Sequence, residues 1–536
     1  MILVWMILLP IAVGLLCYLI PIGLGRIAAV LTHLFMLGLA GYLYMLLRTE
    51  DEMVLNVGGW PDYIGISLRV DHLGVIMVLL TALIFLAVSS FYLKAAYTDS
   101  KMIFLLLTME GLITGIFLAC DLFTIFILIE VSVLVISILI MYKKDSQAIY
   151  DGILYLLLNT VAMIFFVFGL AILYKMTGVL DIRGIYEQLG YLEDKKAIIL
   201  PYAFILTAVS LKAALMPLFS WLPRAHGTPS APSAVSAILS ALYIKTGIYL
   251  FIRVQTMFSP VIDTSQLFLV LGCITALIGA VFALSQQDIK LLLAYSTVSQ
   301  MGLVMMGINL GSVPAQMGAV YHLVSHSLFK VLLFLSAGLL IEEYKTREIG
   351  EIRGVIKRMP LTAAAIFTGL CGLTGAPFYN GSISKYWISY GAKGTWVEYA
   401  LILINFATIL YALKFGRMLF GNSGIARRAV QPSQKITVFL LCAGVLFSGL
   451  FGSALMQSLL SAELSFSWSE YMIKQLIYVG SLLGGLLVYG LRRRTRKIHM
   501  MIYEMELDFN GLCFMISLFF IFLIVYTHFM ISAGLL

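Results

Sequence analysis

Apolar stretches of about 20 residues recur from one end of the chain to the other, and this is the length that a helix needs to cross a membrane. We therefore predict an all-α polytopic membrane protein with about 16 transmembrane helices. The first stretch has neither a basic region before it nor a cleavage pattern, so we expect a spanning helix and not a signal peptide. The expected spans are approximately 1–20, 28–47, 72–94, 101–119, 121–142, 147–174, 201–222, 231–256, 264–284, 289–308, 314–341, 360–391, 398–420, 435–460, 470–491 and 511–533.

Composition agrees with this pattern, because 61% of the residues are hydrophobic, 12% are charged and the mean hydropathy is +1.00. A soluble domain has about 25% charged residues. Lys and Arg are concentrated in one set of alternate loops, among them Lys143, Lys144 and the segment 492–497. The positive-inside rule then predicts a multi-pass protein of the cell membrane with both termini outside.

Sequence motifs for cofactors are absent. The six cysteines lie far apart without a CxxC pair, and there is no P-loop and no GxGxxG turn between a strand and a helix. We therefore expect no cofactor and no metal in this chain, and no nucleic acid as a partner. Any redox chemistry that powers the protein must belong to another subunit, which leaves open whether the chain counts as part of an enzyme.

The alternate loops and the span ends account for all but five of the 35 basic residues, and the five left over inside the apolar spans are all lysines: Lys212, Lys245, Lys330, Lys385 and Lys414. A charged side chain at membrane depth costs at least about 2.5 kcal/mol and normally faces a bundle interior or a wet path. A buried lysine can give up its proton, whereas arginine cannot. These lysines therefore predict proton transfer. The alternative is that some pair with acids or snorkel to the surface, and Lys414, near a helix end, is the best candidate for that.

Acidic residues and histidines lie in the same spans. Glu110 and Glu130 fall in the middle of the fourth and fifth spans, and a coupled ion pair between Glu130 and Lys212 is a natural hypothesis. A purely structural pair is the alternative. His322, His326 and Lys330 are spaced four residues apart and so line one helix face, which favours a proton relay over structural hydrogen bonding or a metal site.

Two spans contain helix-breaking residues, Pro217 after Lys212 and Pro377 before Lys385. Broken helices at membrane depth often mark an ion site, although a simple kink is the alternative. Because a broken helix and a lysine helix occur twice in the same order, we predict two inverted five-helix repeats. The expected domains are the N-terminal helices and external loop (1–100), the first repeat (101–256), the second repeat (264–420) and the C-terminal helices (421–536).

Several long motifs resemble the antiporter-like family shared by respiratory complex I, Mrp-type sodium/proton antiporters and membrane-bound hydrogenases. They are GGWPDYIGISLRVDHLG, DLFTIFILIE, LKAALMPLFSWLPRAHGTPSAPSAVSAILSALYIKTGIYLFIR, QQDIKLLLAYSTVSQMG and HLVSHSLFKVLLFLSAG, and they cover roughly residues 60–420 in the family's order.

The resemblance implies two inverted five-helix half-channels joined by a hydrophilic axis. It implies that Glu130 and Lys212 form the coupled pair, that Lys385 is the exit-side site, and that Lys245, His322, His326 and Lys330 connect them. It also implies partner membrane subunits, including homologous antiporter-like subunits, and a peripheral redox module where the complex is redox-driven.

The chain departs from the family at Phe219, where many members have a histidine. Lys385 places the chain with the members that carry lysine and not glutamate at the second break. The motif TGAPFYNGSISK is more similar to hydrogenase-like or Mrp-like relatives. The segment 492–510 is too short for the long lateral helix of some members.

The leading hypothesis is proton translocation by a subunit of a redox-driven or antiporter complex. Sodium/proton antiport is the alternative, with Glu110 and Asp121 as an accessory cation path, although sodium prefers oxygen ligands and few carboxylates lie in the spans. A solute permease or a structural anchor for redox subunits is the hypothesis from a different class. An anchor, however, has no reason to hold five lysines at lipid depth.

Overall fold

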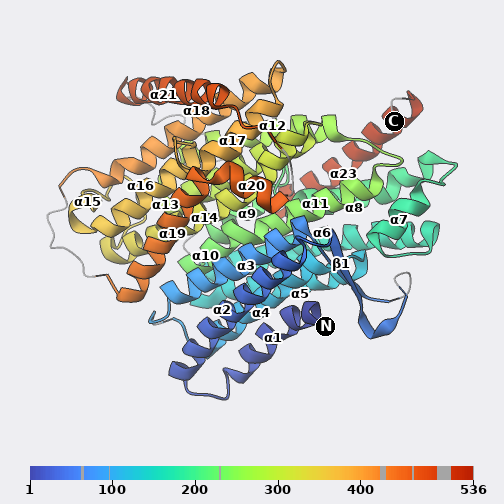
Figure 1. Ribbon diagram of the computed structural model, residues 1–536, viewed down its shortest axis with the longest axis horizontal. Helices are drawn as coiled ribbons and strands as arrows, with labels where there is room; N and C mark the ends of the chain where they lie inside the picture. The colour runs from blue at the N-terminus through green and yellow to red at the C-terminus, as the bar shows by residue number, and fades with distance from the viewer. Residues whose placement is uncertain are drawn as a thin grey trace.

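The computed structural model describes residues 1–61, 65–95, 97–227, 231–422, 430–460, 464–491 and 509–534. In these ranges long helices lie side by side and run across the molecule, from the N-terminal helices at the bottom of Figure 1 to α18 and α21 at the top. Thirteen of the described helices are long and apolar enough to cross a membrane, and the helices α1 (Ile2–Leu16) and α16 (Pro360–Thr374) are apolar but shorter. The chain is therefore a mostly helical polytopic membrane protein, as predicted.

The first half of the chain contains most of the helices around the first break. They are α2 (Ile22–Leu46), α3 (His72–Phe91), α4 (Ser100–Leu118), α5 (Leu122–Ile140), α6 (Ser146–Thr177), α7 (Ile182–Leu189), α8 (Ile199–Lys212), α9 (Trp221–His226), α10 (Ser233–Ile238) and α11 (Ile244–Phe258).

The second half continues the bundle and adds the helices that cover it. They are α12 (Ser265–Ser285), α13 (Ile289–Asn309), α14 (Val313–Tyr344), α15 (Val355–Arg358), α17 (Asn380–Gly391), α18 (Trp396–Gly416), α19 (Pro432–Leu450), α20 (Gly452–Leu460), α21 (Trp468–Leu491) and α23 (Phe509–Ser532). The short segment 492–510, which bears on the lateral helix of some family members, lies almost entirely outside the described residues.

The segment before α3 contains a small β-hairpin, so the all-α expectation is wrong there. β1 (Glu52–Asn56) pairs with β2 (Ser67–Asp71) in antiparallel register, with Glu52 opposite Asp71 and Asn56 opposite Ser67. β2 alternates polar and apolar residues, a period that suits a half-buried strand and not a helix.

Both predicted breaks coincide with helix ends. α8 ends at Lys212 and the helical path resumes only at Trp221, with Pro217 between them. α16 ends before Gly375, whose φ of +80° is left-handed, and α17 begins at Asn380, after Pro377. Each predicted span across a break, 201–222 and 360–391, is thus two helices.

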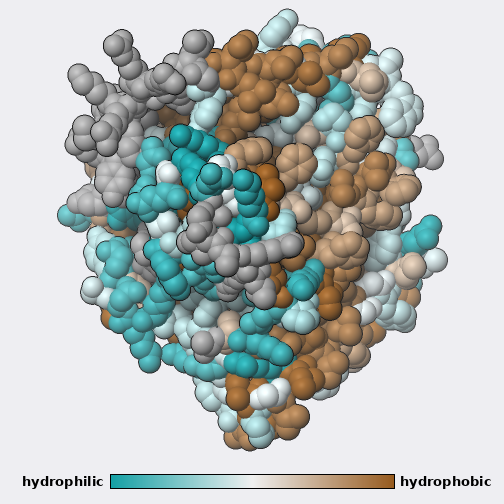
Figure 2. Space-filling view, turned by 90° about the vertical axis from the view of Figure 1, so that its left-hand side faces the viewer, coloured by the Kyte–Doolittle hydropathy of each residue, from teal (hydrophilic) through white to brown (hydrophobic). Residues whose placement is uncertain are grey.

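One end of the bundle, at the left of Figure 1, carries a polar face. Figure 2 shows this end directly, with hydrophilic residues gathered over its middle and left and hydrophobic residues along its upper and right-hand margins. Such a distribution fits a bundle end in water that adjoins helix sides in lipid.

Candidate functional site

Lys212, at the end of α8, is buried and bound to a tyrosine. Its Nζ donates a hydrogen bond to the Tyr243 hydroxyl at 3.0 Å and lies 5.2 Å from the centre of that ring. The same hydroxyl lies 3.1 Å from Ser132 Oγ of α5. A Cβ at Gly247 would overlap the Lys212 backbone, so only glycine lets α11 approach the break this closely. Because a cation is favoured at a helix C-terminus, the break itself stabilises the ammonium.

Glu130, on α5, is only half-buried, and the ion pairs among the described residues do not include the direct pair with Lys212 that we expected. Lys212 still acts on Glu130 electrostatically, and Ser132 of the same helix contacts the Tyr243 hydroxyl. The pair is therefore indirect, because the Tyr243 hydroxyl occupies the position next to the ammonium that a carboxylate would take.

Lys245 is fully buried on α11, directly after the π-helical turn Leu239–Tyr243. Its Nζ donates to the Ser240 carbonyl at 3.1 Å and lies 3.0 Å from Nδ1 of His326. An ammonium has no acceptor, so while Lys245 is protonated the ring must accept at Nδ1 and carry its own proton on Nε2. This Nε2 is buried and has no hydrogen-bond partner among the described residues.

His322 lies one turn earlier on α14 and links three helices. Its Nδ1 is 2.8 Å from Ser384 Oγ of α17, and its Nε2 is 3.1 Å from Gln300 Oε1 of α13. The rings of His322 and His326 are 6.3 Å apart between centroids. Gln300 also donates to the Tyr411 hydroxyl at 3.2 Å, so the line of polar contacts continues into α18.

Lys330 lies on the same α14 face and is fully buried. Its Nζ donates to the Leu293 carbonyl at 2.7 Å and to Ser296 Oγ at 2.5 Å, both on α13. The spacing of four residues therefore does place His322, His326 and Lys330 toward the interior, as predicted, with a polar stripe of α13 opposite.

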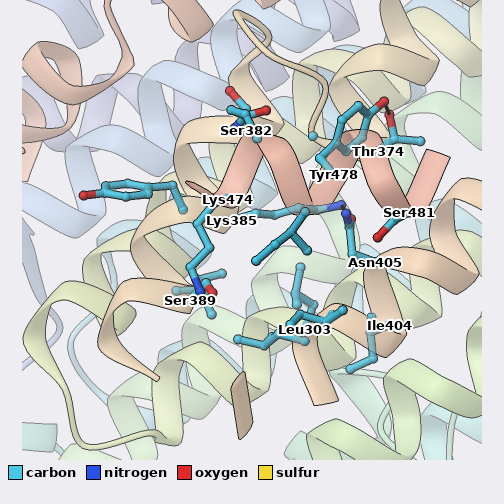
Figure 3. A pocket seen from close by; sticks show the side chains of 17 residues that line it. Leu303, Thr374, Ser382, Lys385, Ser389, Ile404, Asn405, Lys474, Tyr478 and Ser481 are labelled. Atoms are coloured by element: carbon cyan, nitrogen blue, oxygen red, sulfur yellow. Dashed lines mark hydrogen bonds between the residues drawn. The ribbon is translucent and has the colours of Figure 1, made fainter. Parts of the chain in front are cut away.

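Lys385, on α17, borders a cavity of about 80 Å³ (Figure 3). Its Nζ donates to the Leu373 carbonyl at the end of α16 and to Asn405 Oδ1 of α18, each at 2.8 Å. Tyr478 and Ser481 of α21 also line the cavity, which has polar partners and room for water. Lys385 thus lies beside a space large enough for water.

The accessory candidates lie apart from these residues. Lys414 donates to the carbonyls of Leu284, at 2.8 Å, and Gln286, and so binds the C-terminal end of α12 as a structural cap. Asp121 caps the start of α5 by accepting from the Thr124 amide at 2.6 Å. Burial raises the pKa of Asp121 above its ordinary value. Glu110 is buried in α4, against helix α2.

Sequence reasoning missed some polar residues that contact this site. Lys290 is one of them: it is 3% exposed and donates to the Ala231 carbonyl at 2.7 Å and to Ser236 Oγ at 3.2 Å. Tyr243 was also missed, since a tyrosine in an apolar span gives no signal of its own. The polar positions of α13, Ser296 and Gln300, are four residues apart and could have been recognised as one face.

The site defines a class: a polytopic bundle with two broken helices whose interior is crossed by lysines and histidines. The model of the family described as NADH:quinone oxidoreductase/Mrp antiporter, TM matches residues 119–411. The chain belongs to this family of antiporter-like membrane subunits, and the resemblance seen in the sequence is confirmed.

Known relatives and structures agree with this assignment. The chain is 31% identical over 442 residues to the NADH-quinone oxidoreductase subunit N of Desulforudis audaxviator, covering 76% of this chain and 86% of the relative. It is 27% identical over 382 residues to a Na(+)/H(+) antiporter subunit of Bacillus subtilis, covering 70% and 77%. Its fold is similar to a chain of the Mrp complex from Dietzia sp., with a TM-score of 0.79 at 23% identity over 89% of this chain and 99% of that one.

Proposed function

We propose that this antiporter-like subunit moves protons along the line of buried bases from Lys212 to Lys385. The observation that carries the proposal is the contact between Lys245 and His326 at 3.0 Å, in a place with no exposure to solvent. Two donors cannot face each other at that distance, so one hydrogen lies between the two nitrogens and one of them accepts it. Because either base can hold this hydrogen, the contact can pass a proton from one side chain to the other.

The remaining steps use the neighbouring contacts. The Tyr243 hydroxyl accepts a hydrogen bond from Lys212, and Tyr243 precedes Lys245 by two residues. His322 continues the route from His326 toward Ser384 of α17. The cavity beside Lys385 supports its role as the exit-side base, because water in it can accept the proton. Glu130 sets the charge balance at the other end through its electrostatic interaction with Lys212.

The internal organisation is part of the proposal. Two inverted five-helix repeats, 101–256 and 264–420, would lie between the N-terminal unit 1–100 and the C-terminal unit 421–536. The number of crossings would be sixteen when the short helices α1, α8 and α16 are counted with the thirteen long ones. The break after Lys212 and the break before Lys385 support the repeat. The start of α1 and the end of α23 both lie in the right-hand half of Figure 1, which supports termini on one side of the membrane. The excess of Lys and Arg in the opposite loops supports that side being the outside.

The relatives support proposals about the partner subunits and about the transported ion. The Dietzia structure is of a Mrp complex, and we propose that this chain likewise works with other membrane subunits, including homologous ones, and with a redox module if the complex is redox-driven. Protons are preferred over sodium because the axis consists of amines and imidazoles, whereas sodium needs oxygen ligands. The alternative, sodium/proton antiport, is favoured by the name of the B. subtilis relative.

The test is transport by the purified complex in sealed vesicles, followed with a pH dye and a sodium dye. We expect Lys212→Met to abolish proton movement while the complex still assembles, and wild-type pumping to persist without sodium. Lys414→Met is the matched control, because this lysine binds the carbonyl groups at the end of α12. Transport by the assembled Lys212→Met complex would contradict the proposal and favour an anchor, and strict sodium dependence would favour antiport.

A further inference from the structure

A second pair of titratable groups lies in the N-terminal helices, before the segment that the family model matches. His33 of α2 and Glu110 of α4 are both fully buried, with Nδ1 and Oε2 2.7 Å apart. The other ring nitrogen, Nε2, lies 2.9 Å from Ser89 Oγ of α3. The second carboxylate oxygen, Oε1, is buried without a hydrogen-bond partner among the described residues.

The charge of this pair depends on one proton. An ionised Glu110 beside a neutral His33 leaves a net negative charge and an unpaired oxygen in an apolar interior, which is costly. Uptake of one proton by the imidazole converts the pair into a neutral ion pair. The carboxylate also fixes the ring, so that Nδ1–H faces Glu110 and Nε2 faces Ser89, whose hydroxyl can either donate or accept.

A small cavity adjoins this pair. Its volume is about 20 Å³, enough for about one water. His33 and Ser89 line it together with Arg26 and Tyr97, and we call the part lined by Arg26 and Tyr97 its rim. Arg26 is seven residues before His33 on α2, so the rim is roughly 10 Å from the imidazole along the helix.

The charged and titratable groups around the cavity come from several elements. Arg26 donates to the carbonyls of Thr98 and Ala95, which holds its guanidinium at the rim. Tyr92 and Tyr97 lie on the wall contributed by the α3–α4 connection, and Glu342 of α14 acts electrostatically on both tyrosines.

We propose that His33 and Glu110 form a second proton-binding site, loaded through Ser89 from the side of the membrane that carries Arg26. The site is separate from the lysine axis, since its contacts run between α2, α3 and α4. The inference rests on the proposed function only in that the chain takes part in proton transport. A purely structural link between α2 and α4 is the competing account.

Infrared difference spectroscopy of the reconstituted complex after a pH jump tests the site directly. We expect the wild type to give an imidazole and a carboxyl signal, and both signals to disappear together in His33→Gln and in Glu110→Gln. Ser89→Ala should keep the signals but slow their appearance by about 10²-fold, the lower limit for a positioned proton-transfer group. Thr32→Val is the control, because this buried hydroxyl bonds to the Ala28 carbonyl of its own helix.

The outcomes separate the two accounts. If the carboxyl signal survives His33→Gln, or the imidazole signal survives Glu110→Gln, the pair does not share a proton and the inference is overturned. If both variants fail to assemble, an unchanged loading rate in Ser89→Ala overturns it. Lys212→Met is expected to keep the infrared signals while losing transport. Transport that survives Lys212→Met would contradict the proposed function, whereas the inference about His33 and Glu110 would still be decided by the infrared signals.

Discussion

The contact between Lys245 and His326 supports one prediction that can be worked out from the structure. Both side chains are fully buried, and Nζ of Lys245 lies 3.0 Å from Nδ1 of His326. Replacing His326 by glutamine keeps an acceptor for the ammonium but removes the group that can take its proton. Replacing it by leucine removes both. The two variants therefore separate hydrogen bonding from proton transfer.

We expect His326→Gln to leave the stability of the complex nearly unchanged and to lower proton transport by about 10²-fold or more, the contribution of a positioned proton-transfer group. In His326→Leu the Lys245 donor loses its side-chain partner, which costs about 1–3 kcal/mol, and more for a charged group. Only this second variant should show a lower unfolding temperature.

The assay combines proton uptake by vesicles that contain the purified complex with thermal unfolding of the same preparations. Lys414→Met serves as a reference for a lysine outside the axis, and it should affect stability more than transport. Wild-type transport rates in His326→Gln would refute the shared-proton reasoning. Equal stability losses in the glutamine and leucine variants would refute the role given to the hydrogen bond.

Two further predictions concern groups on either side of the axis. Tyr243→Phe removes the hydroxyl that receives the Lys212 ammonium, so proton transport should fall by about 10²-fold with assembly retained, and an unchanged rate would remove Tyr243 from the route. Burial acts to raise the pKa of Asp71, but its hydrogen bond to Arg253 at 2.7 Å and the charge of that arginine outweigh burial and hold the pKa below its ordinary value. The folded state therefore gains stability above about pH 4 that it loses as the pH falls through the lowered pKa. Asp71→Asn should cost roughly 1–3 kcal/mol at neutral pH and flatten the acid side of a melting-temperature profile, whereas an unaltered profile would mean that the ion pair contributes nothing.

Charge within apolar stretches made much of the site predictable from sequence. Lys245, Lys330 and Lys385 stood out because a charged side chain at membrane depth is costly, and the structure buries or half-buries each of them next to polar partners. The breaks were visible because proline and glycine interrupt helices for local steric reasons.

Pairing in space was not predictable in the same way. The predicted pair of Glu130 and Lys212 rests only on their opposite charges. No pattern along the chain indicates that the Tyr243 hydroxyl lies next to the Lys212 ammonium. His33 and Glu110 are 77 residues apart, and only the packing of α2 against α4 brings them together. Lys290 was missed because it lies one residue inside α13, within the error of any helix boundary read from hydropathy.

The central claim is that buried bases, and not carboxylate-bound sodium, carry charge through this subunit. Proton uptake by vesicles in sodium-free medium, measured for complexes carrying Lys212→Met, Lys245→Met or Lys385→Met beside Lys414→Met, tests it most directly. The account predicts that each of the first three variants loses transport while assembled and that the fourth retains it. Wild-type transport in any of the first three, or no transport by the wild type without sodium, would contradict it.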